Sequence, residues 1–207
     1  MRATYARRGL AEADLAPTWL DQFERWLHDA LECELPEVNA MVLATAGADG
    51  APSARTVLCK GDDPRGFHLY TNHGSRKGRD MAANPRASLV FPWLALGRQV
   101  VVAGAVERLS DATSDAYFAS RPRGSRLGAL ASPQSSVLGS RDELERAYAE
   151  LAERYPEGAD VPRPEHWGGL RVVAQSVEFW QGRPGRMHDR LVYQRRGEGW
   201  ATERLAP

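Results

Sequence analysis

The sequence has only two cysteines, only two lysines and no excess of either charge. Cys33 and Cys59 stand alone, without CxxC spacing, so neither a disulfide scaffold nor a structural zinc site is expected, and we predict no metal. The 27 basic side chains balance 27 acidic ones, which argues against a nucleic acid or an anionic membrane as the main partner.

Long hydrophobic runs are also missing. The longest, over residues 100–106, is interrupted by Gly104 and predicts a buried strand rather than a membrane span. The N-terminal segment has no apolar h-region, so we expect no secretory signal, and the lone cysteines fit a reducing cytoplasm. A length of 207 residues with 43% hydrophobic side chains predicts one globular domain.

Hydrophobic periodicity predicts a mainly β protein, an antiparallel barrel with helices packed outside it. Helices are expected over residues 18–35, 75–83, 110–120 and 140–155, the last opened by a capping box of Ser140 and Glu143. Strands are expected over residues 40–46, 52–60, 67–71, 87–93, 98–109, 170–180, 186–195 and 199–205. Residues 61–66 and 121–125 are expected to be turns.

The neutral total hides an uneven distribution of charge. Residues 55–126 carry twelve basic and six acidic side chains, whereas the segment before them has a net charge of −5 and the segment after them −1. Both lysines, Lys60 and Lys77, lie in this positive central part. A concentrated basic patch in a neutral protein favours small phosphorylated ligands over a polymer, although an ordinary solvated surface would give the same count.

Two clusters within the basic part are suited to phosphate. Ser75, Arg76 and Lys77 stand at a predicted helix N-terminus, where backbone N–H groups and the helix dipole already favour an anion. The second cluster repeats at four-residue intervals and consists of Tyr117, Arg121 and Ser125. Guanidinium groups bind phosphate oxygens with two parallel hydrogen bonds, and hydroxyls add neutral donors. Together the clusters indicate two separate phosphates.

A third group of polar residues, RMHDR, occupies positions 186–190. On a strand, Arg186, His188 and Arg190 would project from one face, with Met187 and Asp189 behind them. The two guanidinium groups would disfavour protonation of His188, and we expect Asp189, which points the other way, to be a scaffold residue.

These clusters belong to motifs that resemble, in the same order, those of the pyridoxine (pyridoxamine) 5′-phosphate oxidase family. The most specific are RTVLCK at 55–60, YTN at 70–72, GSRK at 74–77, SRPRGS at 120–125, QSS at 134–136, EFWQG at 178–182 and RMHDR at 186–190. The resemblance covers nearly the whole chain. It implies a split β-barrel of Greek-key-like antiparallel topology that forms a homodimer, with one FMN at each of two sites built from both subunits.

The resemblance also implies a division of the chain and a set of flavin contacts. It describes residues 1–207 as one FMN-binding domain, with a mobile N-terminal arm over 1–16 and a C-terminal strand region over 169–207 that contributes to the dimer and the active site. The implied FMN contacts are Arg55, Thr56, Val57, Leu58, Cys59, Lys60, Tyr70, Thr71, Arg76, Lys77, Gln99, Gln134, Ser135, Trp180 and Arg190.

For the substrate, the resemblance implies pyridoxamine or pyridoxine 5′-phosphate oxidised by dioxygen, with hydrogen peroxide as second product. The implied substrate contacts are Lys60, Tyr117, Arg121, Ser125, Arg186 and His188, with Arg2 and Tyr5 from the N-terminal arm. Of these, Arg186 and His188 are the candidate catalytic residues. Two alternatives remain: a flavin oxidase of phenazine biosynthesis, which would not need the phosphate set of Tyr117, Arg121 and Ser125, and a non-catalytic protein that binds FMN or pyridoxal phosphate.

Overall fold

The structure, a computed structural model, describes residues 9–207, and its main element is an antiparallel sheet of nine strands. The strands are β1 (Ala40–Ala46), β2 (Pro52–Leu58), β3 (Gly61–Asp63), β4 (Gly66–Asn72), β5 (Arg86–Trp93), β6 (Arg98–Arg108), β7 (Trp167–Gln181), β8 (Asp189–Arg196) and β9 (Gly199–Arg204). The helices are α1 (Trp19–Glu32), α2 (Arg76–Ala83), α3 (Asp111–Ser120), α4 (Arg123–Ala131) and α5 (Arg141–Arg154). The mainly β fold with peripheral helices is therefore confirmed.

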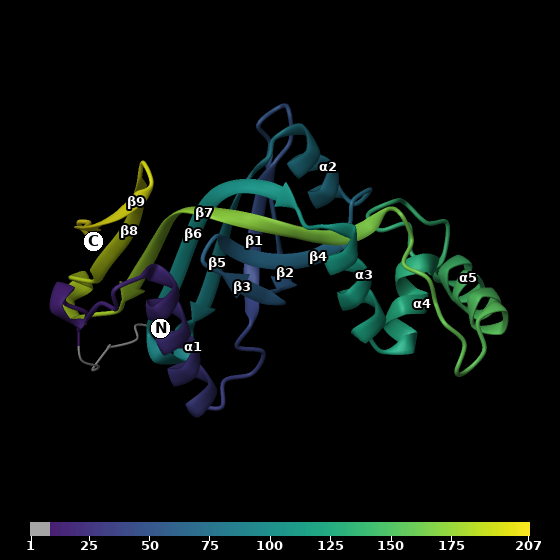
Figure 1. Cartoon of the computed structure of the whole chain (residues 1–207), viewed down its shortest axis with the longest axis horizontal. Coiled ribbons are helices and arrows are strands. Elements are labelled where there is room, and N and C mark those ends of the chain that lie inside the picture. The colour runs from purple at the N-terminus through teal and green to yellow at the C-terminus, as the bar shows by residue number, and fades with distance from the viewer. Residues whose placement is uncertain (1–8) are drawn as a thin grey trace.

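The long strand β7 organises the sheet. One edge of β7 pairs with β6, while the other edge pairs with β4 along its first half and with β8 along its second half. The strand order is β2-β1-β5-β6-β7-β4-β3, and β8 and β9 continue from the second half of β7. Figure 1 shows the resulting curled sheet, with the β8–β9 hairpin at one end and the helices α3 to α5 at the other.

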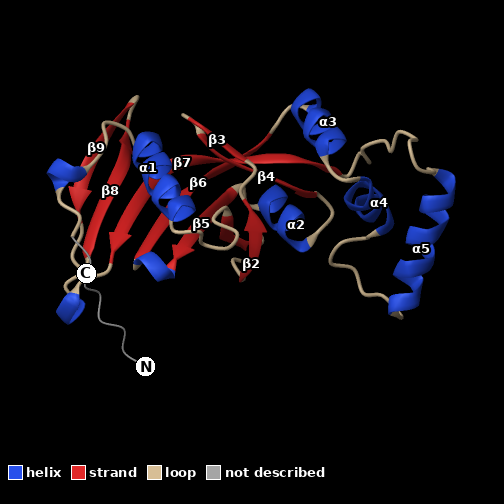
Figure 2. Ribbon diagram, turned by 90° about the horizontal axis from the view of Figure 1, so that it is seen from below, coloured by secondary structure: helices blue, strands red, loops and turns tan. Residues whose placement is uncertain are grey.

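Helix α1 covers the inner face of the curl (Figure 2). The hydroxyl of Thr18 caps the helix by accepting the N–H of Asp21 at 3.1 Å, as the sequence predicted. Helical spacing then places Phe23 and Trp26 on the buried face, where the Phe23 ring packs 4.8 Å from Phe67 of β4. This aromatic packing forms the main core and holds the sheet edges in place.

A second, smaller core lies under the helical lobe, by which we mean α3, α4, α5 and the loop over residues 155–166. Phe118, Leu127, Val161 and Trp167 are its buried members. Because Trp167 is also the first residue of β7, this core attaches the helical lobe to the sheet. No helix of the described residues is long and apolar enough to cross a membrane.

Two segments that the sequence predicted as turns contain regular structure. Strand β3 forms within residues 61–66 and pairs with β4. Helix α4 begins inside the predicted turn 121–125, directly after Pro122. Proline is compatible with a helix start. The two glycines in α4 disfavour a helix, and the full burial of Leu127 supplies the packing that stabilises it.

Two predictions of local geometry were wrong. The backbone N–H of Gly139, not that of Ser140, donates to the Glu143 carboxylate at 3.2 Å, so the predicted capping box does not form. Residues Pro184–Arg186 form a single 3-10 turn in which Arg186 has φ +64, and β8 starts only at Asp189. Arg186, His188 and Arg190 therefore do not alternate along one strand face, because the Pro-Gly pair at 184–185 favours a turn.

Candidate active site

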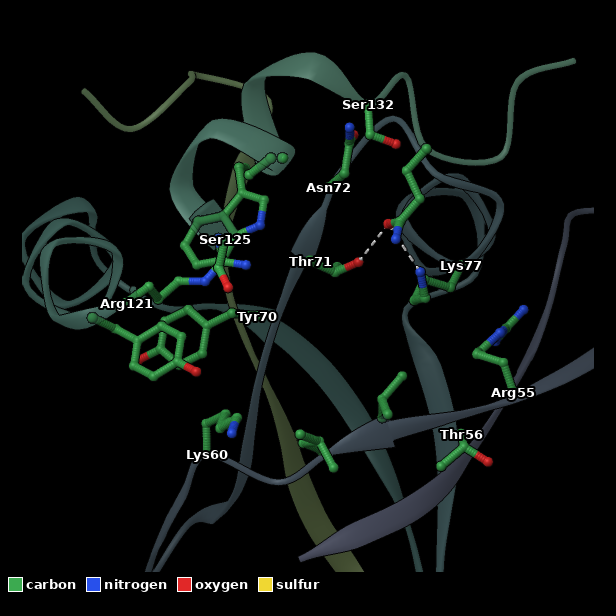
Figure 3. Close-up of a pocket in the computed structure, with 17 residues that line it drawn as sticks. Arg55, Thr56, Lys60, Tyr70, Thr71, Asn72, Lys77, Arg121, Ser125 and Ser132 are labelled. Carbon is green, nitrogen blue, oxygen red and sulfur yellow. Dashed lines mark hydrogen bonds between the residues drawn. The ribbon is translucent and has the colours of Figure 1, made fainter. Parts of the chain in front are cut away.

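A cavity of about 640 Å³ lies between the sheet and the helical lobe (Figure 3). Strands β2 and β4 and helix α2 provide one side, and α3 and α4 provide the other. Its lining residues are Arg55, Thr56, Val57, Leu58, Lys60, Tyr70, Thr71, Asn72, Lys77, Tyr117, Arg121, Ser125, Gly128, Ala129, Ser132, Gln134 and Trp167. The volume is in the range of ordinary small-molecule sites.

Arg55 is held at one end of the cavity by neighbours on β1 and β2. Its Nη1 donates to the Thr45 hydroxyl at 2.7 Å, and its Nη2 donates to the Ser53 hydroxyl at 2.5 Å. Both hydroxyls donate in turn to Oδ2 of Asp80, which lies 3.8 Å from Arg55 Nη2. The hydrogen bonds from Thr45 and Ser53, together with the nearby cations, lower the pKa of Asp80 and keep it ionised.

Lys77 lies beside Arg55 at the same end, on the first turn of α2. Ser75 caps this helix through the N–H of Gly78, as predicted from its position. The Lys77 ammonium is buried and donates to Gln134 Oε1 at 3.1 Å, an oxygen that also accepts the Thr71 hydroxyl at 3.2 Å. Burial and the charge of Arg55 lower the pKa of Lys77. Arg55 has Asp80 as its one nearby carboxylate, and Lys77 has no carboxylate partner among the described residues, so the two cations form a first anion-binding end of the cavity.

The opposite end is built from stacked aromatic rings. The rings of Tyr70 and Tyr117 lie 3.8 Å apart and within 17° of parallel, and Trp167 continues the stack 5.6 Å from Tyr70. The Arg121 guanidinium carbon lies 4.7 Å above the Trp167 ring. Burial raises the pKa of Tyr117, which keeps its hydroxyl protonated as a hydrogen-bond donor.

Arg121 is the clearest sign of a ligand at this second end. Its Nη1 is buried and has no hydrogen-bond partner among the described residues, and burial lowers the pKa of the guanidinium. A buried cation without a counter-ion is costly unless a ligand supplies the missing charge. Figure 3 places Arg121 and Lys60 on one side of the cavity and Arg55 and Lys77 on the other. The cavity therefore offers two separate positions for anionic groups.

The predicted site residues fall into two sets. Most of them line the cavity: Arg55, Thr56, Val57, Leu58, Lys60, Tyr70, Thr71, Lys77, Tyr117, Arg121, Ser125 and Gln134. Cys59 is buried and its thiol donates to the Gly61 carbonyl at 3.3 Å, and burial raises its pKa to about 11. Arg76 and Ser135 are exposed next to lining residues. Arg2 and Tyr5 lie outside the described residues.

The second set does not line the cavity. Gln99, Trp180 and Arg190 form a cross-strand row on β6, β7 and β8, because Gln99 pairs with Trp180 and Trp180 with Arg190. The His188 ring lies 4.6 Å from the ring of Trp180. Arg186 belongs to the turn just before His188. One copy of the chain does not bring this row, His188 or Arg186 into the lining of its own cavity.

Residues around this row are held by ion pairs. Arg190 forms two hydrogen bonds to Glu178, at 2.7 and 2.9 Å, and a third to the Ala206 carbonyl. Asp189 accepts the N–H of Leu10 at 3.0 Å and pairs with Arg204 at 2.8 Å. Asp189 thus ties β8 to the segment before α1, an arrangement that agrees with the scaffold role predicted for it.

Several functional positions were not found from the sequence. Asn72, Gly128, Ala129, Ser132 and Trp167 line the cavity, and Asp80 orients Arg55. Asp80 did leave a signal, because it is the one acid in the basic segment 76–80. Trp167 left none, because its role depends on the contact between the start of β7 and the helical lobe.

The curled antiparallel sheet, the helical lobe beside it and the cation-lined cavity between them define the class, which is a split-barrel protein with a site for small anionic ligands. The profile described as Pyridoxamine 5′-phosphate oxidase matches residues 27–155, and the profile of the Pyridoxine 5′-phosphate oxidase C-terminal dimerisation region matches residues 167–207. The chain belongs to the pyridoxamine 5′-phosphate oxidase family. This membership confirms the resemblance and the enzyme class, and the dimerisation region supports the predicted homodimer.

Individual relatives agree. Proteins named pyridoxine/pyridoxamine 5′-phosphate oxidase from Burkholderia multivorans and Thermosynechococcus vestitus are 57% and 56% identical, each over 100% of this chain and 97% of its own length. Among solved structures, PhzG from Burkholderia lata, in complex with tetrahydrophenazine-1-carboxylic acid, has a TM-score of 0.92 at 31% identity over 99% of this chain and 100% of its own. An FMN binding protein from Nostoc punctiforme shares the fold, with a TM-score of 0.73 at 20% identity over 93% of this chain and 98% of its own.

Proposed function

We propose that this protein is an FMN-dependent oxidase of pyridoxamine 5′-phosphate and pyridoxine 5′-phosphate that acts in the cytoplasm. Each turnover would remove two electrons from the C4′ carbon and transfer them to dioxygen. Pyridoxamine phosphate, water and dioxygen would give pyridoxal 5′-phosphate, ammonia and hydrogen peroxide. Pyridoxine phosphate and dioxygen would give the same aldehyde and hydrogen peroxide.

The observation that carries the proposal is the pair of anion-binding ends in one cavity. FMN and a phosphorylated pyridine each bring one phosphate and one flat ring. The first end has the two cations Arg55 and Lys77, and the second has Arg121, whose buried Nη1 has no hydrogen-bond partner in the part of the chain that the structure describes. Stacked Tyr70 and Tyr117 add flat apolar surface at the second end. The residues present therefore fit both groups.

We assign the first end to the flavin phosphate, with Arg76 as a further cation. The contacts proposed for the rest of the flavin are those that the family resemblance implies, including the backbone and side chains of residues 56–60 and the amide of Gln134. Bound FMN would supply the two-electron acceptor for the C4′ hydride and the group that dioxygen reoxidises.

The second end is assigned to the substrate phosphate. Arg121 offers a charge-assisted N–H, and the hydroxyls of Tyr117 and Ser125 offer neutral donors around the same space. Lys60 lies on the same side in Figure 3 and adds a second cation. A phosphate held at the second end would fix the distance between C4′ and the flavin. Such positioning of the reacting atoms is the main contribution that the protein makes to the reaction.

Arg186 and His188 are proposed to reach the substrate from the second subunit, because they do not line the cavity of their own chain. The C-terminal region 169–207 that carries them overlaps the family's dimerisation region. The N–H of Arg183 donates to His188 Nδ1 at 3.0 Å, so a neutral imidazole carries its proton on Nε2. We propose that His188 orients the substrate. Arg186, in the turn before β8, would lie over the pyridine ring, as the family resemblance implies.

A phenazine-type oxidase is the second candidate, favoured by the TM-score of 0.92 to PhzG. Arg121 argues for a phosphorylated substrate instead, because its buried Nη1 has no hydrogen-bond partner among the described residues and a substrate without an anion would leave this cation uncompensated. A binding protein without turnover would need neither Arg186 nor His188.

The proposal is tested by turnover under air. Purified protein with FMN should convert pyridoxamine 5′-phosphate to aldehyde and peroxide in equal amounts, with one dioxygen consumed for each. Dephosphorylated pyridoxamine should react with a kcat/KM lower by at least about 100-fold, the value of one to two charged hydrogen bonds. Aldehyde without peroxide, or equal reaction with both amines, would contradict the proposal.

A further inference from the structure

Trp167 occupies the junction between the two cores. Its side chain is 6% exposed, its ring forms part of the cavity lining, and it packs edge-on against Phe118 at 5.0 Å. The Tyr117 ring lies within 2° of parallel to it. The indole is thus fixed on one side by the helical lobe and on the other by the aromatic stack.

The indole also carries the guanidinium of Arg121, 4.7 Å above its ring. A cation over an indole face is stabilised by the ring quadrupole, most strongly when water is excluded. Stacking uses the face of the guanidinium and leaves the N–H donors at its edge available. This arrangement explains how the buried Nη1 of Arg121 can lack a hydrogen-bond partner among the described residues before an anion arrives.

Arg163 fixes the main chain of Trp167. Its Nη1 donates to the Trp167 carbonyl at 2.6 Å. Its Nε and Nη2 donate to Asp115 at 2.6 Å and to Asp111 at 2.8 Å, both on α3. The Arg163 side chain is 13% exposed, so these bonds are shielded from solvent on the arginine side. One guanidinium therefore connects the start of β7 to the helix that carries Tyr117.

We propose that Trp167 determines specificity for the phosphate group of the substrate, and that Arg163 is its positioning residue. The indole holds the Arg121 guanidinium in the orientation that receives the phosphate. Arg163 fixes the position of the indole relative to α3. The inference rests on the proposed function, because it concerns the substrate end of the same cavity. It predicts that both residues act on the phosphate and neither acts on the C4′ chemistry.

The informative quantity is the ratio of kcat/KM for pyridoxamine 5′-phosphate to kcat/KM for pyridoxamine. In Trp167→Leu the KM for the phosphorylated amine should rise about 30-fold, and in Trp167→Phe about 3-fold, which spans the range of buried to weak cation–π contacts. In Arg163→Met the KM should rise about 10-fold, and Arg163→Lys should recover part of this loss because it keeps one charged donor. For all four variants kcat should stay within about twofold, since uniform binding energy appears in KM.

Arg141→Met is the matched control, because Arg141 also pairs with a carboxylate of the helical lobe, Glu145 at 2.6 Å, but is 83% exposed. It should leave the ratio unchanged. FMN content and thermal unfolding, measured for each variant, identify any variant that fails to fold. Arg163→Lys keeps the positive charge and Trp167→Phe keeps an aromatic ring, so these two variants carry the test if Trp167→Leu does not fold.

The inference is overturned if the folded variants leave the ratio unchanged, which includes an equal loss of kcat/KM for both amines. Failure of the proposed function has a different result, namely no oxidation of the phosphorylated amine by the unaltered protein. In that case the ratio of dissociation constants for pyridoxal 5′-phosphate and pyridoxal replaces the kinetic ratio. A loss of phosphate preference in the variants supports the inference, and an unchanged preference contradicts it.

Discussion

Lys77 and Gln134 meet at the first anion-binding end of the cavity, where Lys77 Nζ donates to Gln134 Oε1 at 3.1 Å across 57 positions of sequence. The same oxygen accepts the Thr71 hydroxyl, so the amide joins β4, α2 and the segment after α4. Because the ammonium is buried and has no carboxylate partner among the described residues, an anionic ligand is its expected counter-ion.

Replacing this cation should weaken flavin binding. In Lys77→Met the Kd for FMN should rise about 10- to 150-fold, the value of one charged hydrogen bond. Quenching of flavin fluorescence during titration measures the Kd. Arg79→Met is the control, since Arg79 is an exposed cation on the same helix. Equal effects of the two substitutions would show that Lys77 contributes only general charge.

Asp80 should make stability depend on pH. Hydrogen bonds from Thr45 and Ser53 lower the pKa of Asp80 in the folded state, so its stabilisation is complete above the unfolded pKa of about 3.9 and is lost as pH falls through the lower folded value. At pH 7, Asp80→Asn should reduce the free energy of unfolding by about 1–3 kcal/mol. Urea unfolding at several pH values should show the difference from the unaltered protein narrowing below about pH 4. A difference that stays constant down to pH 3 would contradict this origin.

Replacing Gly78 in α2 with a larger residue should lower the stability of the folded protein. A Cβ at this position would lie 2.2 Å from the carbonyl oxygen of His73, and backbone cannot move as a flexible side chain can. Gly78→Ala should therefore cost about 1–3 kcal/mol of stability. Gly128→Ala, in α4, meets no atom within 4 Å and should gain about 0.5–1 kcal/mol from helix propensity. Thermal unfolding of the two variants in parallel measures both effects, and similar changes in Tm would contradict the packing argument.

Shared active sites predict that two inactive variants restore each other. Arg121→Ala damages the cavity, whereas His188→Ala damages the region proposed to reach the cavity of the second subunit. After subunits are mixed and reassembled at random, half of the dimers are mixed and each holds one intact site, so activity should return to about a quarter of the unaltered value. Each variant reassembled with itself is the control. If activity does not recover although mass spectrometry shows that mixed dimers have formed, Arg121 and His188 act in a site built from one chain.

Local chemistry explains what the sequence could predict. The α2 cap at Ser75 and the α1 cap at Thr18 depend on neighbouring residues only, and both form as expected. The two phosphate clusters also followed from residue type and spacing, and Lys77 and Arg121 line one cavity. Hydrophobic periodicity likewise predicted most of the strands of the sheet.

Long-range packing explains what the sequence could not predict. Helix α4 begins in a segment whose proline and glycines indicate a turn, and burial of Leu127 decides the outcome. The turn at Arg186 is the exception, since the Pro-Gly pair at 184–185 is a local turn signal that the strand prediction overlooked. The role of Trp167 appears only when the start of β7 contacts the helical lobe, because the Arg121 ring contact crosses 46 positions of sequence.

The central claim is that the two anion-binding ends place a phosphorylated amine against a flavin for oxidation at C4′. Anaerobic mixing of the FMN-loaded protein with pyridoxamine 5′-phosphate tests it most directly, followed by the visible absorption of the flavin. The account predicts loss of the oxidised flavin band with one aldehyde formed per flavin, and return of the band when air is admitted. A flavin that stays oxidised at saturating pyridoxamine 5′-phosphate would contradict the account.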